Sequence, residues 1–415
     1  MVLKKTKFYY IFDSLIFIFI LYWSLFPSRF TPKLILNELI MSFSDLSIII
    51  LVFLFCPFLF LNLKYFSLKE VILLCFSFIV FWAALSLLRI YDKHYIPIAI
   101  YTLLMSWLSM FVGYLISKSQ ILYRKFERNF LTKLSLVLCM IFVIYAFQSI
   151  FHAGFRSQAI ITESLGIERL KGPLGGAAVI QFIMIIVFAV LFGNLQNNRK
   201  PKTLYIITTI ITGINIFLTG SRSGLIGIVF FFLLLILSRR SIRLYIKLII
   251  IIIAVLIILT PIIKFDRFRN FEDQTRFETY QKGLYIVLSS LDIFIFGKGY
   301  GNVWPWYKRE MEFMQGLNIS NIYYNPFVGK LLYHPHSVFL ELFVELGLIS
   351  VIPFIIILIS IVKKLIILLR IKKYDINFYI VIGLLSTFPM MFLDLYFFKN
   401  WKISTIWWIY LFSSI

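Results

Sequence analysis

The sequence predicts an all-α polytopic membrane protein, with about twelve transmembrane helices and one large outer loop that contains short helices. Apolar residues make up 61% of the 415 residues and charged residues only 14%, whereas soluble domains are about a quarter charged. Apolar runs long enough to cross a bilayer, which takes roughly 20 residues, recur along most of the chain. The runs are continuously apolar rather than alternating, which favours helices over the strands of an outer-membrane barrel.

The apolar runs place the twelve helices in order along the chain. They cover residues 8–26, 46–62, 71–88, 96–116, 132–151, 174–193, 203–219, 223–237, 244–263, 346–362, 377–393 and 402–415. The chain then divides into membrane helices 1–5 (1–151), central membrane helices with an outer loop and arginine motifs (152–263), a large outer loop (264–345) and membrane helices 10–12 (346–415). The first run is too long for a cleavable signal peptide, and no small-residue cleavage site follows it.

Lysine and arginine orient these helices, because cytoplasmic loops of membrane proteins carry an excess of them. If the N-terminus is cytoplasmic, 22 of the 41 basic residues fall on that side, together with only Glu70, Glu127 and Asp375. We therefore expect cytoplasmic N- and C-termini. The net charge of +22 then reflects topology and contact with anionic membrane lipids, not a nucleic-acid surface.

Functional residues are expected on the outer side. The three cysteines, Cys56, Cys75 and Cys139, lie inside apolar runs, which excludes a disulfide framework and a Cys-based zinc site. The cytoplasmic loops are short and basic and contain no nucleotide-binding element. By contrast, the outer segments 152–173 and 264–336 depart from plain membrane-spanning composition, and all four histidines fall on the outer side.

Arg222 lies in the segment LTGSRSGLIG, where Gly220, Ser221 and Arg222 form a tight turn between two predicted helices. An arginine at membrane depth is costly unless it is paired or faces a cavity. Its planar guanidinium suits phosphate, and backbone N–H groups at the start of the next helix can join in. An interfacial arginine that reaches the lipid headgroups explains the spacing equally well.

Arg169 and Lys171 lie in the segment ERLKGPLGG, directly before the sixth predicted helix. Pro173 and the neighbouring glycines break the chain there, so a phosphate could approach the amide groups closely. Taken alone, these residues are explained more simply as an ordinary loop-to-helix junction with a basic pair.

His334 and His336 lie in the segment YHPHSVFLELFVELG, ahead of an apolar helix. A histidine there can act as a general base near neutral pH. We expect the rigid Pro335 to point the two rings in different directions, and His336 is the better candidate because it directly precedes the helix. A metal site would need a third ligand, and His-Pro-His suits chelation badly, although Glu341 and Glu345 follow.

Together these motifs resemble the bacterial O-antigen ligase and polymerase superfamily. The resemblance rests on Arg169-Leu-Lys-Gly-Pro before a helix, Gly220-Ser221-Arg222-Ser223-Gly224 at a helix end, a long outer loop with Arg276, the glycine-rich turn Gly297–Gly301, His336 followed by Gly347, and Asp394 before the final helix. It extends from about residue 150 to the end of the chain.

The resemblance implies a glycosyltransferase of the bacterial inner membrane with a periplasmic active site. Its donor would be a glycan linked to undecaprenyl diphosphate. Arg222, Arg169 and Lys171 would bind the diphosphate, and His336 would be the catalytic base that takes the proton from the acceptor hydroxyl, with inversion at the anomeric carbon. Supporting roles are assigned to Ser221, Arg276, His334, Glu341 and Asp394. No metal, nucleotide sugar, ATP or other cofactor is expected.

Two enzymes and one transporter are compatible with this resemblance. A ligase would transfer the glycan to a sugar of the lipid A-core, as in lipopolysaccharide biosynthesis, and this is the favoured alternative. An O-antigen or capsular polysaccharide polymerase would transfer it to another lipid-linked repeat unit. A transporter of lipid-linked sugars should carry polar residues along the middle of several helices, whereas polarity here is concentrated at the outer ends.

Overall fold

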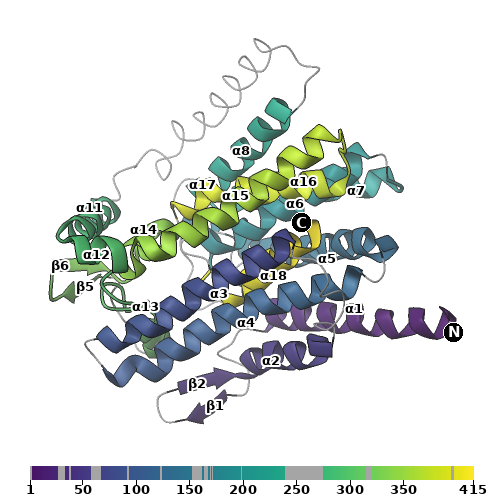
Figure 1. The fold of residues 1–415 in the computed structure, drawn as a ribbon. Coiled ribbons are helices and arrows are strands. Elements are labelled where there is room, and N and C mark those ends of the chain that lie inside the picture. The colour runs from purple at the N-terminus through teal and green to yellow at the C-terminus, as the bar shows by residue number, and fades with distance from the viewer. Residues whose placement is uncertain are drawn as a thin grey trace.

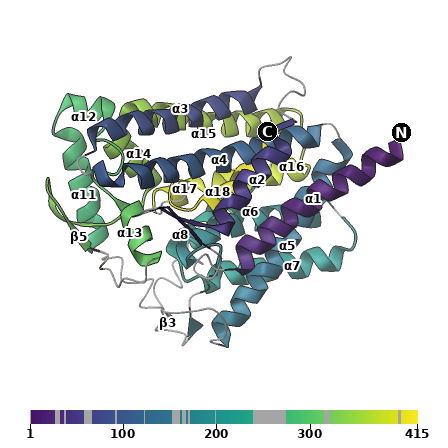
Figure 2. The ribbon, with the colours of Figure 1, turned by 90° about the horizontal axis from the view of Figure 1, so that it is seen from below.

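A computed structural model describes most of the chain as one helical body with short hairpins, shown from two directions in Figures 1 and 2. The described residues are 2–26, 33–36, 39–57, 67–90, 93–121, 124–151, 161–162, 167–168, 170, 172–197, 199–238, 274–314, 320, 322–393 and 397–415. These residues are mainly helical, as the composition predicts.

The helices follow the apolar runs of the sequence. They are α1 (Val2–Leu25), α2 (Phe43–Phe55), α3 (Leu68–Ser86), α4 (Ile96–Ile121), α5 (Arg124–Ile150), α6 (Ala177–Gln196), α7 (Lys202–Leu218), α8 (Arg222–Ser238), α11 (Gln274–Leu288), α12 (Leu291–Phe296), α13 (Trp306–Met314), α14 (Val338–Leu346), α15 (Leu348–Arg370), α16 (Ile376–Ser386), α17 (Phe388–Met391) and α18 (Trp401–Ser414). Antiparallel hairpins join β1 (Lys33–Leu36) to β2 (Leu39–Ser42), β3 (Ile161–Thr162) to β4 (Ile167–Glu168), and β5 (Ile322–Asn325) to β6 (Gly329–Leu332).

The C-terminal helix α18 forms the centre of the body. It packs against α4 and also contacts α6 and α16, and its residues from Lys402 to Ser414 are all buried. Gly113 of α4 permits the close approach, because a Cβ at this position would lie 2.7 Å from Cβ of Trp408. Small residues that bring two backbones together are typical of helix contacts in membranes. The last predicted helix is therefore a core element.

The two ends of the body carry different elements. In both views the N-terminus lies at one end, whereas α11, α12 and the hairpin of β5 and β6 lie at the opposite end (Figures 1 and 2). Lys364 Nζ donates a 2.7 Å hydrogen bond to the carbonyl oxygen of Ile415, so the second half of α15 runs beside the C-terminus.

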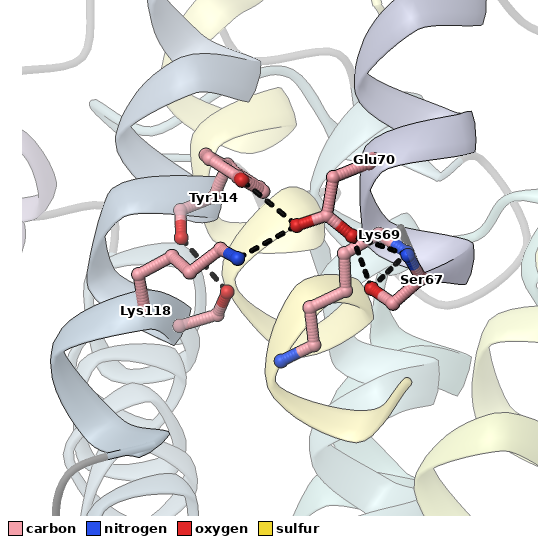
Figure 3. Close-up of polar contacts among 6 residues, drawn as sticks. Ser67, Lys69, Glu70, Tyr114 and Lys118 are labelled. Carbon is pink, nitrogen blue, oxygen red and sulfur yellow. Dashed lines mark hydrogen bonds and ion pairs between the residues drawn. The ribbon is translucent and has the colours of Figure 1, made fainter. Parts of the chain in front are cut away.

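A polar cluster joins the start of α3 to the end of α4 (Figure 3). Ser67 caps α3 by accepting a hydrogen bond from the Lys69 N–H, and Glu70 accepts one from the Ser67 N–H at 2.8 Å. The other oxygen of Glu70 accepts from Lys118 Nζ at 2.6 Å and from the Tyr114 hydroxyl at 2.9 Å. One of the few acids on the predicted cytoplasmic side thus neutralises a buried lysine and ties two neighbouring helices together.

Five described segments are long and apolar enough to cross a membrane. They are Leu68–Arg89, Lys93–Ser119, Asn129–Ile150, Val179–Gln196 and Leu348–Arg370. The twelve predicted spans are not confirmed as a set, since α7 and α8 have 17 residues each and α18 has 14. At a rise of 1.5 Å per residue these helices are roughly 21–26 Å long, shorter than the ~30 Å hydrocarbon layer. The predicted helix 244–263 lies outside the described residues.

Two predicted helix boundaries are wrong for identifiable backbone reasons. The predicted helix 377–393 is divided into α16 and α17 at Thr387, two residues before Pro389, whose missing N–H interrupts the helical hydrogen bonds. The predicted helix 346–362 starts at Leu348, after Gly347, whose φ of +71° separates α14 from α15.

The topology gives a direct prediction. Reporter fusions after residues 200 and 370 should read cytoplasmic, and fusions near residue 310 should read periplasmic, because 22 basic residues alternate in this way. Paired alkaline phosphatase and green fluorescent protein fusions measure this. A cytoplasmic signal near residue 310 would move the candidate site to the other side of the membrane and contradict the proposed chemistry as well.

Candidate active site

The turn between α7 and α8 is built as the sequence predicts. α7 ends at Leu218, Gly220 has a φ of +57°, and α8 begins at Arg222. The Gly220 N–H donates to the Phe217 carbonyl at 2.9 Å, and the Ser221 N–H donates to the Thr219 hydroxyl at 3.3 Å. Arg222 therefore occupies the first turn of a helix whose N-terminal amide groups favour an anion.

Gln181 of α6 forms hydrogen bonds to this turn, a role that the sequence motifs do not indicate. Its Nε2 donates to the Ser221 hydroxyl at 2.7 Å and to the Ser223 hydroxyl at 2.5 Å, and its Oε1 accepts from the Thr219 hydroxyl at 3.4 Å. All four side chains are buried. A glutamine within the apolar run VIQFIMIIVF is a detectable signal, since a buried amide needs partners.

The segment before α6 lies against the same turn. The Leu170 N–H donates to the Leu218 carbonyl at 3.1 Å, and Leu170 is completely buried. Asn400, which caps α18, donates from Nδ2 to the Leu174 carbonyl at 2.8 Å. Arg169 and Lys171 flank Leu170 in the sequence but lie outside the described residues, so their predicted role remains a proposal.

The two histidines are closer together than predicted. The rings of His334 and His336 lie against each other, with centroids 3.9 Å apart and planes inclined by 42°. The prediction that Pro335 separates their directions is therefore wrong. His336 adopts a φ of +51°, which turns the chain back after the proline and brings the rings together. Such a conformation is costly for a residue with a Cβ and is maintained only where the surroundings enforce it.

Cations surround the histidine pair. Burial lowers the pKa of His334 well below its usual value, and positive charge on Lys399, His336, Arg276 and Arg309 lowers it further. His334 is therefore neutral at neutral pH. Arg276 was predicted as a supporting residue, whereas Arg309 and Lys399 were not, because nothing in their local sequence indicates that they reach this place.

The glycine-rich turn after α12 packs on the far end of α14. Gly297, Gly299 and Gly301 all have positive φ, and a Cβ on Gly297 would lie 2.3 Å from the Glu345 carbonyl oxygen. The Lys298 N–H donates to the Val344 carbonyl at 2.9 Å. The turn is thus a structural support for the helix that follows His336, and not a nucleotide loop.

Glu345 anchors this turn. Its carboxylate is fully buried and accepts hydrogen bonds from the N–H groups of Gly301 at 2.9 Å, Val303 at 3.2 Å and Trp304 at 2.8 Å. Burial raises the pKa of Glu345 to about 8, and the three N–H donors oppose that rise. Glu345 is therefore a structural residue that holds the glycine-rich turn on α14.

Glu341, one helical turn earlier on α14, is buried, and only one of its two carboxyl oxygens has a hydrogen-bond partner among the described residues. Its Oε1 accepts a hydrogen bond from Trp306 Nε1 at 2.9 Å, and among the described residues its Oε2 has no hydrogen-bond partner. Burial raises the pKa of Glu341 well above its usual value, and the neighbouring Glu345 adds to the rise. The pair thus retains a proton at neutral pH.

The raised pKa of Glu345 should make the stability of the fold depend on pH. The Glu345 pKa of about 8 exceeds the value of 4.5 expected in the unfolded chain, so its protonation stabilises the fold below pH 4.5 and this contribution is lost as pH rises toward 8. Glu345→Gln should flatten this dependence in thermal unfolding of the purified protein between pH 5 and 8. It should also unfold earlier at pH 5, since one lost acceptor costs about 1–3 kcal/mol. An unchanged pH slope would contradict the assignment.

The segment around α17 contacts both α8 and α14. α17 contacts α8, and Met390 lies against Gly227 on the second turn of that helix. Phe392, directly after α17, stacks on Phe339 of α14, with ring centroids 4.2 Å apart. Asp394, two residues further along the chain, lies outside the described residues. The described contacts of this segment thus reach α8, which begins at Arg222, and α14, which follows His336.

An apolar groove lies beside the same segment. It has a volume of about 460 Å³. It is lined by Phe230 and Leu234 of α8, Val362 and Leu365 of α15, and Leu385, Phe388, Pro389 and Phe392 around α17. Because all of these side chains are apolar, the groove suits a hydrocarbon chain and not a sugar.

The described fold is that of a polytopic helical membrane protein. Residues 206–355, which run from α7 into α15, match the model of the family described as O-antigen ligase. This match confirms the predicted resemblance to the O-antigen ligase and polymerase superfamily, and it supports an O-antigen ligase-like membrane enzyme. No curated protein and no solved structure matches the chain.

Proposed function

We propose that the protein is a membrane glycosyltransferase that moves a glycan from undecaprenyl diphosphate to an acceptor sugar hydroxyl on the periplasmic face of the inner membrane. The acceptor would be the lipid A-core, which makes the protein an O-antigen ligase. The supporting observation is that the matched segment 206–355 contains both the Arg222 turn and the histidine pair. In the described structure α17 contacts α8, and Phe392 stacks on Phe339 of α14.

The donor would bind across the arginine turn and the apolar groove. The diphosphate would contact the Arg222 guanidinium and the N-terminal amide groups of α8, with Arg169 and Lys171 joining from the neighbouring segment. Its polyprenyl chain would lie in the groove beside α8, whose lining is entirely apolar. One helix would then contact both the charged group and the lipid tail of the donor.

The acceptor would react beside the histidine pair. His336 would take the proton from the acceptor hydroxyl while the hydroxyl oxygen forms the bond to the anomeric carbon of the donor. The bond between that carbon and the diphosphate oxygen breaks, and the leaving diphosphate takes the electron pair. In-line attack inverts the anomeric centre, and Arg222 would neutralise the charge that develops on the leaving group.

A bound donor diphosphate would offset the positive charge near His334 and so assist this step. Arg276, Arg309 and Lys399 lower the pKa of the buried His334, so on their own they oppose a second positive charge at this place. A bound diphosphate would offset them and favour a protonated His336. The proposed base would therefore be most effective in the complex with the lipid-linked donor.

A deletion strain tests this proposal and distinguishes the two enzymes. For a ligase, the lipopolysaccharide gel should show bare lipid A-core, and long glycan should accumulate on the polyprenyl carrier. Cores capped with a single repeat unit would indicate a polymerase, whose acceptor is another lipid-linked repeat. A wild-type gel pattern, together with no transfer by the purified protein in detergent, would overturn the glycosyltransferase proposal. Complementation with the wild-type gene is the control.

A further inference from the structure

Tyr280 of α11 holds together two segments that are far apart in the sequence. Its hydroxyl lies 3.2 Å from the carbonyl oxygen of His336 and also donates to the carbonyl oxygen of Phe392. One phenolic hydrogen is thus shared between the segment of the histidine pair and the segment that follows α17. Neither the family resemblance nor the sequence motifs indicated this residue.

The surroundings of Tyr280 fix its position. On the same helix, Lys282 Nζ donates to the Lys330 carbonyl at 2.8 Å, and the Thr279 hydroxyl accepts from the Leu332 N–H at 3.4 Å. Both contacts attach α11 to β6, which leads directly into the histidine pair. The Tyr280 hydroxyl is therefore presented to the His336 carbonyl from a helix that is itself held in place.

Both acceptors of Tyr280 belong to residues whose placement matters for the site. His336 has a φ of +51°, so its carbonyl orientation depends on contacts that hold this uncommon backbone conformation. The Phe392 ring stacks on Phe339 at 4.2 Å, so the same two segments also meet through their side chains. Without the hydroxyl, ring stacking would keep the segments in contact, but the hydrogen bonds that Tyr280 makes to the two carbonyls would be lost.

We propose that Tyr280 is a positioning residue that holds His336 in place against the segment that follows α17. This inference rests on the proposed glycosyltransferase function, in which His336 is the base. A misplacement of about 1 Å can reduce a rate by about a hundredfold, so loss of one orienting hydrogen bond should reduce turnover without removing a reacting group.

The test compares Tyr280→Phe with Tyr285→Phe. Tyr285 lies on the same helix but is 70% exposed, so it controls for the loss of a phenolic hydroxyl from α11. Transfer from a lipid-linked donor should show a kcat about tenfold to a hundredfold lower for Tyr280→Phe, with KM for the donor and the unfolding temperature near those of the wild type. Tyr285→Phe should match the wild type in all three. A lowered unfolding temperature with unchanged kcat would overturn the positioning role.

A second readout does not depend on transferase activity. The rate at which diethyl pyrocarbonate modifies His336, measured by peptide mass spectrometry relative to the exposed His94, should change in Tyr280→Phe and not in Tyr285→Phe. An unchanged rate would overturn the inference. An inactive wild-type protein would instead refute the proposed function, and the modification rate would then decide separately whether Tyr280 positions His336.

Discussion

Replacement of His336 by alanine is expected to lower the rate of glycan transfer by about 10²–10⁴-fold, the usual contribution of a general base. The residue lies directly before Ser337, whose hydroxyl caps α14, so its backbone is anchored to a packed helix. Purified protein, lipid-linked donor and acceptor in detergent are sufficient for the measurement. The variant should remain folded, because the Ser337 hydroxyl caps α14 and the His336 side chain takes no part in that cap.

Two further histidines serve as controls. His334→Ala should lose less activity than His336→Ala, because His334 is neutral and would act only through its contact with the neighbouring ring. His94→Ala should retain full activity, since His94 is exposed. Equal, full activity in the His334 and His336 variants would remove histidine from the mechanism and direct attention to Glu341, Glu345 or Asp394.

We expect glycan transfer not to depend on a divalent metal ion. Among the described residues, no three His, Cys, Asp or Glu side chains form a group that could hold a metal ion. EDTA should leave the wild-type transfer rate unchanged, as the proposed chemistry assigns charge neutralisation to arginine. Chelator-sensitive activity that is restored by an added divalent metal would contradict this assignment and revive a metal role for the histidines.

The sequence predicted the helical body well because long apolar runs leave few alternatives to membrane helices. It predicted the turn at Gly220 for a similarly local reason, since small residues between two apolar runs indicate a tight connection. The exact lengths of the helices were less predictable. Thr387 and Gly347 interrupt apolar sequence that reads as continuous, and only the backbone geometry shows that α16 and α15 end and begin there.

The candidate site residues were predictable only where they lie next to one another in a short sequence motif. Arg222 and the histidines lie in short recognisable segments, whereas Gln181, Arg309 and Lys399 reach the same region from distant parts of the chain. Their roles depend on tertiary packing, which a single sequence does not record. The direction of the His334 and His336 rings was wrongly predicted for the same reason, because the φ of His336 is set by its surroundings.

Replacement of Arg222 by alanine is expected to reduce transfer by about 10²–10³-fold, as removal of a donor that stabilises developing negative charge does in other enzymes. Arg222 begins α8, so its guanidinium and the first amide groups of the helix would contact the same diphosphate. Ser221 and Ser223 are held by Gln181 and should keep the turn in place without the arginine. Protein abundance in the membrane should therefore remain near that of the wild type.

Arg222→Lys distinguishes phosphate binding from membrane anchoring. Lysine keeps the charge and can still reach the headgroups, but it replaces a planar bidentate donor with a compact point charge. If Arg222 binds the donor diphosphate, the lysine variant should remain poorly active and its KM for the lipid-linked donor should rise. Arg89→Ala is the matched control, because Arg89 is an exposed arginine on the predicted outer side and should be dispensable. Full activity in Arg222→Lys would mean that Arg222 is only an interfacial anchor, since anchoring requires a positive charge and not the geometry of a guanidinium.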